Sequence, residues 1–337
     1  MPKPRIHADR LAKAFGPVRA VRGVSIAIDT PGVTGLLGPN GAGKSTTIRM
    51  LTGFTAPDTG SASIAGVDLA DHPAAARANL GYAPETAPLY PELTPAQYLD
   101  LRARLYGLRR PQRRAATSRE IHRCRLVPVA DRRIGGLSKG YRQRVALAAA
   151  LAHDPPVVIL DEPASGLDPA QIIELRKTVL ELGQTKAVLL SSHVLAEIEK
   201  TCDRVVIIAA GRVLADGAAA EVAAAGPTQL VAEFAPPVGA DPALARHHAA
   251  ELLARVPGLE SSLAARRLTD AGEPWVRMTA PYDADTAEAL AKALVSAGWR
   301  VRELRAERPT LEARFVQLLS TAADTPRQPE TDGAPAA

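Results

Sequence analysis

Long apolar segments are absent from this sequence of 337 residues. A membrane-spanning helix needs about 18 or more consecutive apolar residues, whereas the richest runs, Val157–Leu160 and Val205–Ala210, are only long enough for a strand. No helix is therefore predicted to cross a membrane. Residues 1–9 contain basic side chains but no apolar stretch follows them, so we expect no secretory signal and a cytoplasmic location.

Cysteine and aromatic residues are also scarce. The two cysteines, Cys124 and Cys202, lie far apart in the sequence and form no C-x-x-C pair. This pattern fits a reducing compartment and indicates that both cysteines are buried packing residues and not metal ligands or disulfide partners. Only 4% of the residues are aromatic, while 46% are apolar and 23% are charged. Such a balance indicates a globular protein whose core is built mainly from Ala, Leu and Val.

Positive charge exceeds negative charge, with a formal net charge of +5. The excess is uneven, because arginines crowd residues 102–133, where Glu120 and Asp131 are the only acids. Aromatic residues do not alternate with these arginines as they do on base-stacking surfaces, so no nucleic-acid partner is expected. Two readings of the arginines stay open: a solvated helical face, or a contact with an anionic membrane surface or a partner.

The chain length and the order of the segments predict two domains. Residues 1–225 alternate short apolar runs, turns and helical stretches, which is typical of an α/β domain, and a helical subdomain is predicted at about 84–152. An Ala-Gly-Pro passage marks the boundary near residue 225. Residues 226–321 show the order β-α-β-β-α-β of a small ferredoxin-like α+β domain. The Pro- and Ala-rich residues 322–337 are predicted to be a disordered tail.

One helix of the second domain carries several sequence signals. Asp285 and Glu288 are its predicted capping pair, and Gly298 is predicted to end it. Its apolar face is predicted to contain Ala287, Leu290, Ala291, Leu294 and Val295. A further helix is expected near the end of this domain, at about residues 310–319.

Residues 38–46 form a Gly-rich loop between an apolar run and a predicted helix. Their sequence, Gly38-Pro39-Asn40-Gly41-Ala42-Gly43-Lys44-Ser45-Thr46, matches the phosphate-loop pattern G-x-x-x-x-G-K-[ST] in full. Glycines let backbone N–H groups surround phosphate oxygens, and a helix N-terminus favours an anion. Lys44 is therefore predicted to contact the β- and γ-phosphates of ATP, and Ser45 to bind Mg²⁺. A dinucleotide-binding loop fits poorly, because Thr46 stands where its third glycine belongs.

The apolar run Val157–Leu160 ends in two acids, Asp161 and Glu162. Open α/β sheets bind ligands at the carboxyl ends of their strands. Asp161 is predicted to hold Mg²⁺, usually through water. Strand alternation would turn Glu162 to the opposite side, where it is the candidate general base that accepts a proton from the attacking water. The alternative is a pair of solvated acids that only caps the next segment.

Taken together, these motifs resemble the ABC ATPase family over residues 5 to about 220. Leu137-Ser138-Lys139-Gly140-Tyr141-Arg142-Gln143 is similar to the family signature, with Ser138 and Gly140 at its two key positions and Lys139 and Tyr141 in place of commoner residues. The resemblance implies a P-loop NTPase fold with a RecA-like core, an antiparallel β subdomain and a helical subdomain. The start of a helix at Ser138 would again face an anion.

Three further residues take roles from this resemblance. Asp168 closes Ser165-Gly166-Leu167-Asp168, which is similar to the family loop through which two subunits communicate. His193, 31 residues after Glu162, matches the histidine that contacts the γ-phosphate. Phe15 stands where the family stacks an aromatic ring on adenine, although a core role for this ring is also open.

Gly81-Tyr82-Ala83-Pro84-Glu85 departs from the family at its last position, where the family has glutamine. Glu85 can still reach Mg²⁺ through a carboxylate oxygen, but it adds negative charge near the attacking water. This Glu form, together with Thr310-Leu311-Glu312-Ala313-Arg314-Phe315, is similar to an exporter subgroup that includes gliding-motility and bacitracin-resistance ATPases.

The resemblance also implies partners. The sequence contains one phosphate loop and one signature, and in the family each ATP is clamped between the loop of one subunit and the signature of another, which implies a homodimer. Separate transmembrane permease subunits are implied as well, so the chain is expected at the cytoplasmic side of the membrane. Nothing in the sequence identifies the transported substrate or the role of the second domain.

Two other functions fit the sequence less well. A soluble ABC ATPase of translation or DNA repair would generally carry a second nucleotide domain or a long coiled coil, and the sequence has neither a second phosphate loop nor heptads. A non-catalytic ATP sensor would be suggested by the loss of Glu162 or His193, and both are present. Glu85 alone favours the sensor.

Overall fold

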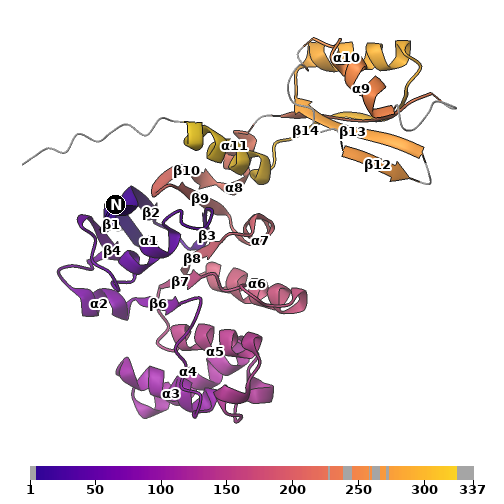
Figure 1. Cartoon of the computed structure of the whole chain (residues 1–337). Coiled ribbons are helices and arrows are strands. Elements are labelled where there is room, and N and C mark those ends of the chain that lie inside the picture. Colours follow the sequence, from indigo (N-terminus) through magenta and orange to yellow (C-terminus); the bar gives the residue numbers. More distant parts are fainter. Residues whose placement is uncertain are drawn as a thin grey trace, which may run out of the picture. The chain divides into compact units, whose positions relative to one another are not determined.

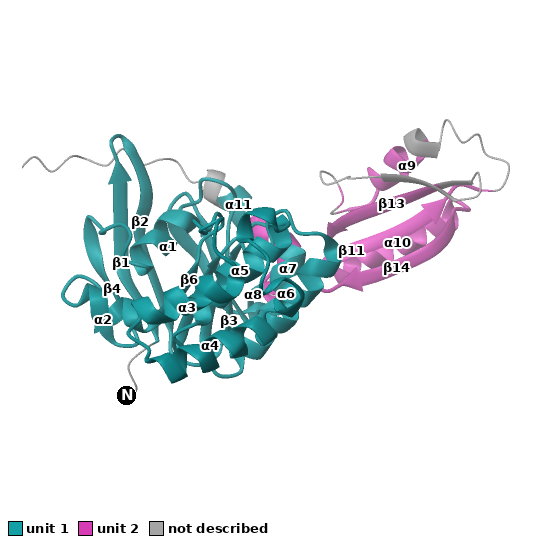
Figure 2. Cartoon of the chain, turned by 90° about the horizontal axis from the view of Figure 1, so that it is seen from below, with its two compact units in different colours: residues 1–222, 318–337 teal, residues 223–317 magenta. Residues whose placement is uncertain are grey.

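The computed structural model describes residues 5–226, 228–237, 245–257, 259, 266–270 and 273–324, which form two units. The first contains residues 1–222 with 318–337, and the second contains 223–317 (Figure 2). Figure 1 labels the helices and strands along the chain. Helix α11 (Leu311–Asp324) includes the first three residues of the predicted tail, and the rest of that tail lies outside the described residues. Within the described part of the chain, no helix is long and apolar enough to span a bilayer.

An antiparallel sheet begins the first unit. Its strands lie in the order β2-β1-β4-β5, with β1 at Ile6–Phe15, β2 at Val18–Ile28, β4 at Thr59–Ile64 and β5 at Val67–Asp68. Alternate residues of β1 and β2, among them Ile6, Val24 and Ile26, are fully or almost fully buried. One face of this sheet therefore belongs to the core.

A second, mainly parallel sheet has the order β10-β9-β3-β8-β7-β6. Its strands are β3 (Gly32–Leu37), β6 (Leu80–Ala83), β7 (Val157–Asp161), β8 (Ala187–Ser192), β9 (Arg204–Ala209) and the antiparallel edge strand β10 (Arg212–Ala218). Every residue of β7 and β8 is buried, as expected for central parallel strands covered on both faces. The core cluster of this unit joins apolar side chains from both sheets with Ile48, Met50 and Leu51 of α1 (Lys44–Leu51), which places α1 between the sheets.

Helices complete the first unit. The predicted helical subdomain contains α3 (Pro95–Leu105), α4 (Arg110–Arg123) and α5 (Lys139–Leu151), with short 3-10 turns at Val127–Val129 and Ile134–Gly136. Thr94 and Gln97 form a capping box that starts α3. The remaining helices are α2 (Pro73–Ala78), α6 (Pro169–Gly183), α7 (Leu195–Thr201) and α8 (Ala219–Ala224).

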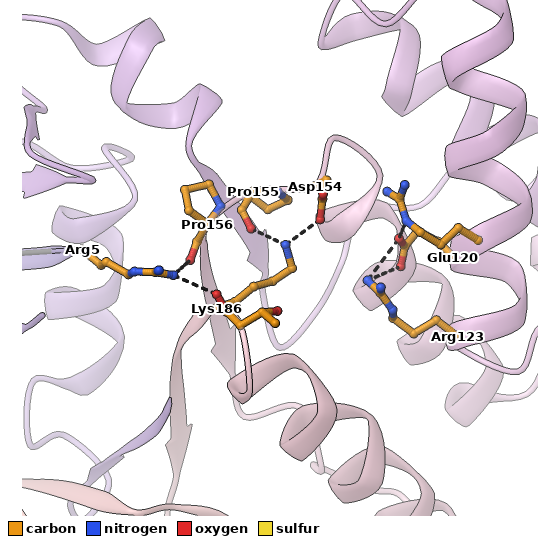
Figure 3. A network of polar contacts seen from close by, with 9 residues as sticks. Arg5, Glu120, Arg123, Asp154, Pro155, Pro156 and Lys186 are labelled. Carbon is orange, nitrogen blue, oxygen red and sulfur yellow. Dashed lines mark hydrogen bonds and ion pairs between the residues drawn. The ribbon is translucent and has the colours of Figure 1, made fainter. Parts of the chain in front are cut away.

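Polar contacts tie together the amino ends of the central strands (Figure 3). Arg5 Nη1 donates to the carbonyl oxygens of Pro156, at 3.3 Å, and Thr185, at 3.0 Å. Lys186 Nζ donates to Asp154 Oδ1 at 2.6 Å and to the carbonyl oxygen of Pro155 at 2.8 Å. These bonds satisfy backbone groups ahead of β7 and β8 and leave the opposite, carboxyl ends of the strands for the site.

The second unit has the predicted ferredoxin-like fold. Its sheet order is β12-β13-β11-β14, and all neighbouring strands are antiparallel. The elements are β11 (Gln229–Ala235), α9 (Ala245–Leu253), β12 (Arg266–Asp270), β13 (Glu273–Pro281), α10 (Ala284–Ser296) and β14 (Arg300–Glu307). Phe234, Leu253, Leu290 and Leu294 are fully buried in a core between the sheet and its helices.

Two details of α10 differ from the sequence prediction. Its N-cap is Asp283, whose carboxylate accepts from Thr286 N at 2.9 Å, so the predicted pair of Asp285 and Glu288 was wrong. Val295 is 70% exposed and does not belong to the apolar face. Gly298, with φ +72°, follows the helix as predicted, because a left-handed residue at that position suits glycine.

Replacing Phe234 by Ala should destabilise the second unit by about 3–5 kcal/mol, because the ring is fully buried and packs edge-on against Trp299 at 5.4 Å. Both tryptophans of the chain, Trp275 and Trp299, belong to this unit, so urea unfolding followed by tryptophan fluorescence reports on it alone. Val301→Ala, at a side chain 40% exposed, is the matched control. An equal loss in both variants would contradict the assignment of Phe234 to the core.

Candidate functional site

The carboxyl ends of the parallel strands bring three sequence segments together. Leu37 at the end of β3 pairs with Ser192 of β8, and Asp161 at the end of β7 pairs with Ser191. The loop after β3 holds Lys44, and the segment after β8 holds His193. The register therefore places the Gly-rich loop, the acid pair and His193 at one edge of the sheet, as the sequence predicted.

Glycines give the loop its shape. Gly41 and Gly43 have φ of +78° and +101°, in the left-handed region that glycine enters freely. A Cβ on Gly43 would lie 2.5 Å from the carbonyl oxygen of Ala20, whereas a Cβ on Gly41 would have no neighbour within 4 Å. A Cβ on Gly38 would collide with the carbonyl oxygen of Ile208. Gly38 and Gly43 are thus needed for close backbone packing as well.

Lys44 is held inside the loop. Its side chain is 6% exposed, and Nζ donates to the carbonyl oxygens of Gly38, at 2.7 Å, and Pro39, at 3.3 Å. The same Nζ lies 3.8 Å from Glu162 Oε1. A buried cation bonded mainly to neutral carbonyls can exchange those bonds for stronger ones to anionic phosphate oxygens.

Ser191 links the two acids. Its hydroxyl donates to Asp161 Oδ1 at 2.7 Å, and it accepts from Glu162 N at 2.8 Å. Burial raises the pKa of Asp161, and the nearby Glu162 and Glu85 raise it further, while the Ser191 hydrogen bond and Lys44 lower it. A cation bound beside Asp161 would relieve the cost of this buried negative charge.

Glu162 has an unusual backbone conformation. Its φ is +47°, so it lies just beyond β7 in the left-handed region that non-glycine residues rarely adopt. The side-chain direction is therefore set by this turn of the chain, and the prediction that strand alternation sets it was wrong. Such conformations cluster at functional sites. Glu162 Oε2 lies 2.8 Å from His193 Nδ1, a contact between two side chains 31 residues apart.

One pocket contains most of these residues. Its lining consists of Val18, Arg19, Ala20, Arg22, residues 39–46, Glu85, Glu162, His193 and Ala210. Glu85 Oε1 also accepts from Ser165 Oγ at 3.3 Å, which connects Glu85, at the position where the family has glutamine, with the loop after the acid pair. The pocket therefore brings the Gly-rich loop, the candidate base Glu162 and the cationic side chains of Arg19, Arg22 and Lys44 to one cavity.

Phe15 lies beside this pocket. Its ring is 51% exposed with Lys13 Nζ 5.9 Å from the ring centroid, and it pairs across the β1–β2 hairpin with Val18, which lines the pocket. Stacking of Phe15 on adenine stays a proposal. The half-exposed ring is available for stacking, because it is not packed into the core.

The signature residues and Asp168 lie elsewhere on the first unit. Ser138 caps α5 and accepts from Tyr141 N at 3.4 Å, and Asp168 caps α6 and accepts from Gln171 N at 2.9 Å. A Cβ on Gly140 would overlap the side chain of Gln171, so the starts of α5 and α6 touch each other. The described residues that line the phosphate-loop pocket do not include Ser138, Gly140 or Asp168.

Sequence reasoning did not single out several residues of this site. Ser191 was not among the predicted site residues, yet it bonds to both acids. Its place at the end of a buried strand, paired with Asp161, was the available signal. Arg19 and Arg22 line the pocket because the β1–β2 hairpin carries them there, a long-range placement that local sequence does not show.

The chain is similar to known proteins over most of its first unit. A family model described as "ABC transporter" matches residues 21–165. The Nod factor export ATP-binding protein I of Paraburkholderia xenovorans is 36% identical over 258 residues, which cover 76% of this chain and 83% of that protein. The ABC transporter ATP-binding protein NatA of Bacillus subtilis is 39% identical over 204 residues, covering 60% of this chain and 82% of NatA.

Solved structures give the same result. The solved structure of an ATP-binding subunit of an ABC transporter matches with a TM-score of 0.60 and 36% identity, covering 64% of this chain and 91% of that one. The cbiO1 protein of Clostridium perfringens, described as part of the transporter complex cbiONQ, matches with a TM-score of 0.60 and 25% identity, covering 65% of this chain and 90% of its own.

Proposed function

This chain belongs to the ABC transporter family of ATPases, and we propose that it is the motor subunit of an exporter, acting as a homodimer on separate membrane-spanning subunits. The observation that carries the proposal is the division of its motifs between two places. The phosphate loop, Glu162 and His193 border one pocket, while Ser138 and Gly140 lie outside it. A site completed by the signature of a second copy accounts for this division. Export is supported by the names of the relatives.

The site also fits Mg²⁺. Ser45 is exposed in the loop, Asp161 is a buried carboxylate with a raised pKa, and Glu85 lines the pocket. Hydroxyl and carboxylate oxygens are the ligands that this ion prefers. We propose that these three residues hold it. When bound, Mg²⁺ neutralises charge on the phosphates.

Five side chains would bind ATP, activate the attacking water or contact the second copy. The Lys44 ammonium would leave the carbonyl oxygens of its loop and bind phosphate oxygens, with backbone N–H groups of the loop beside it. Glu162 would accept the proton of the attacking water. His193, 2.8 Å from Glu162, would orient that carboxylate and reach the γ-phosphate. Phe15 would stack on adenine, and Asp168 would contact the second copy.

A second pocket suits the membrane partner. It is lined largely by apolar and aromatic side chains, including Phe54, Tyr82, Leu89, Tyr90 and Leu105. Phe54 and Leu105 are 72% and 70% exposed. A groove of this kind accepts the apolar face of an amphipathic helix. We assign it to a cytoplasmic helix of the permease subunit, beside the segment that starts at Glu85, so that changes at the nucleotide can reach the partner.

A mixing experiment tests the composite site. Chains with Lys44→Ala lack a working loop, and chains with Ser138→Arg lack a working signature, so each should hydrolyse almost no ATP alone. An equimolar mixture contains mixed dimers that each keep one complete site, and the rate should recover to about one quarter of wild type. Phosphate release measures it, with circular dichroism as the control for folding. If both chains are folded and bind ATP or dimerise, but the ATP hydrolysis rate of their mixture does not recover, the result would argue against sites shared between copies.

A further inference from the structure

The turn between α3 and α4, together with the adjoining ends of both helices, carries a concentration of positive charge. Arg104, Arg109, Arg110 and Arg114 are all exposed. No ion pair involves any of these four within the described part of the chain. We call residues 104–114 the basic turn.

The acids nearest to the basic turn in the sequence already have partners. Asp100 is the only acid between residues 93 and 119, and it bonds Arg113 Nε at 2.8 Å. Glu120 is fully buried and bonds Arg119 and Arg123. The four arginines are therefore not neutralised locally, and their charge faces solvent.

An apolar side chain stands among these charges. Leu105 is 70% exposed next to Arg104. Exposed apolar and basic residues together are typical of segments that lie on the headgroup region of an anionic bilayer. A nucleic acid fits less well, because the aromatic residue of the turn, Tyr106, is stacked on His153 with ring centroids 3.6 Å apart and is not offered to a base.

We propose that the basic turn binds the anionic surface of the membrane. Its position supports this, since Leu105 also lines the groove assigned to the permease helix, so the turn stands at the rim that faces the membrane partner. That part of the argument rests on the proposed function, whereas the charge, the exposure and Leu105 do not. The contact would hold the motor against the leaflet in addition to its hold on the permease.

Vesicle flotation of the full chain without nucleotide tests the proposal. The probes are vesicles of phosphatidylcholine alone and vesicles with about 30% phosphatidylglycerol. Binding should occur to the anionic vesicles only and should weaken as ionic strength rises. Arg109→Gln with Arg110→Gln should lower the partition coefficient at least about tenfold, since each arginine contributes roughly fivefold at such a surface.

A matched control removes the same charge elsewhere. Lys200→Gln with Arg212→Gln, at exposed positions on α7 and β10, should leave flotation within about twofold of wild type. Equal losses in the two double variants would show a net-charge effect and overturn the proposal. Absence of wild-type binding to the anionic vesicles would also overturn the proposal. If the arginine variants then failed to assemble with the permease, the basic turn would bind an acidic protein surface instead. Because the assay needs no ATP and no second copy, failure of the mixing experiment leaves its result intact.

Discussion

Glu162→Gln should lower kcat for ATP hydrolysis by about 10²–10⁴-fold while ATP binding persists. The amide matches the carboxylate in shape and can keep a hydrogen bond to His193, at present 2.8 Å away, but it cannot accept a proton from water. ATP bound without turnover should hold two copies together. Phosphate release and light scattering behind a sizing column, with and without Mg-ATP, measure both effects.

Glu199→Gln is the control for this change, because it removes one acid from the exposed surface of α7. It should hydrolyse ATP at the wild-type rate and show no nucleotide-dependent dimer that outlasts turnover. If Glu162→Gln retained more than about a tenth of the wild-type kcat, Glu162 would not be the general base. If Glu162→Gln were inactive and stayed monomeric with bound Mg-ATP, the result would support Glu162 as the general base and contradict the ATP-dependent homodimer.

Gly43→Ala should weaken ATP binding by about 10- to 1000-fold and lower the melting temperature of the ATP-free protein. Alanine at φ +101° costs about 1–2 kcal/mol. Its Cβ would also meet the carbonyl oxygen of Ala20 at 2.5 Å, and relieving that overlap costs about 1–3 kcal/mol more. The loop would have to move away from β2, which changes where its N–H groups point.

Gly41→Ala is the matched control, since φ is +78° there and a Cβ would meet nothing within 4 Å. It should carry only the conformational cost, so its melting temperature without nucleotide should lie clearly above that of Gly43→Ala. Thermal unfolding and titration with a fluorescent ATP analogue compare the two. Equal melting temperatures would mean that close packing against Ala20 does not decide the shape of the loop.

Much of the fold was predictable because its signals are local. The apolar runs before the phosphate loop and before Asp161 are buried strands, and the order β-α-β-β-α-β in the second unit fixes four antiparallel strands. Errors arose where several local choices have nearly equal free energy. Asp283 and Asp285 are both acceptable caps, and only the backbone path into α10 selects Asp283.

The candidate site was also predictable only where its signals are local in the sequence. Lys44, Asp161 and Glu162 were identified from motifs, because phosphate binding and proton transfer demand particular residue types in order along the chain. The left-handed turn at Glu162 and its contact with His193 were not, because they depend on strands that meet across the sheet. Nor did the sequence reveal that Ser191 bonds both acids.

Contiguous residues carry the family resemblance, the chemistry of the loop and the single set of motifs, so all three could be recognised from the amino-acid order. The set of residues that share a pocket depends instead on the folded chain, which joins the loop to Glu162 and His193 and keeps Ser138 outside. It also leaves Arg104, Arg109, Arg110 and Arg114 of the basic turn without a carboxylate partner in the part of the chain that the structure describes. The physical reason is that pairing of strands and burial of side chains act between residues distant in the chain, and a sequence pattern records only near neighbours.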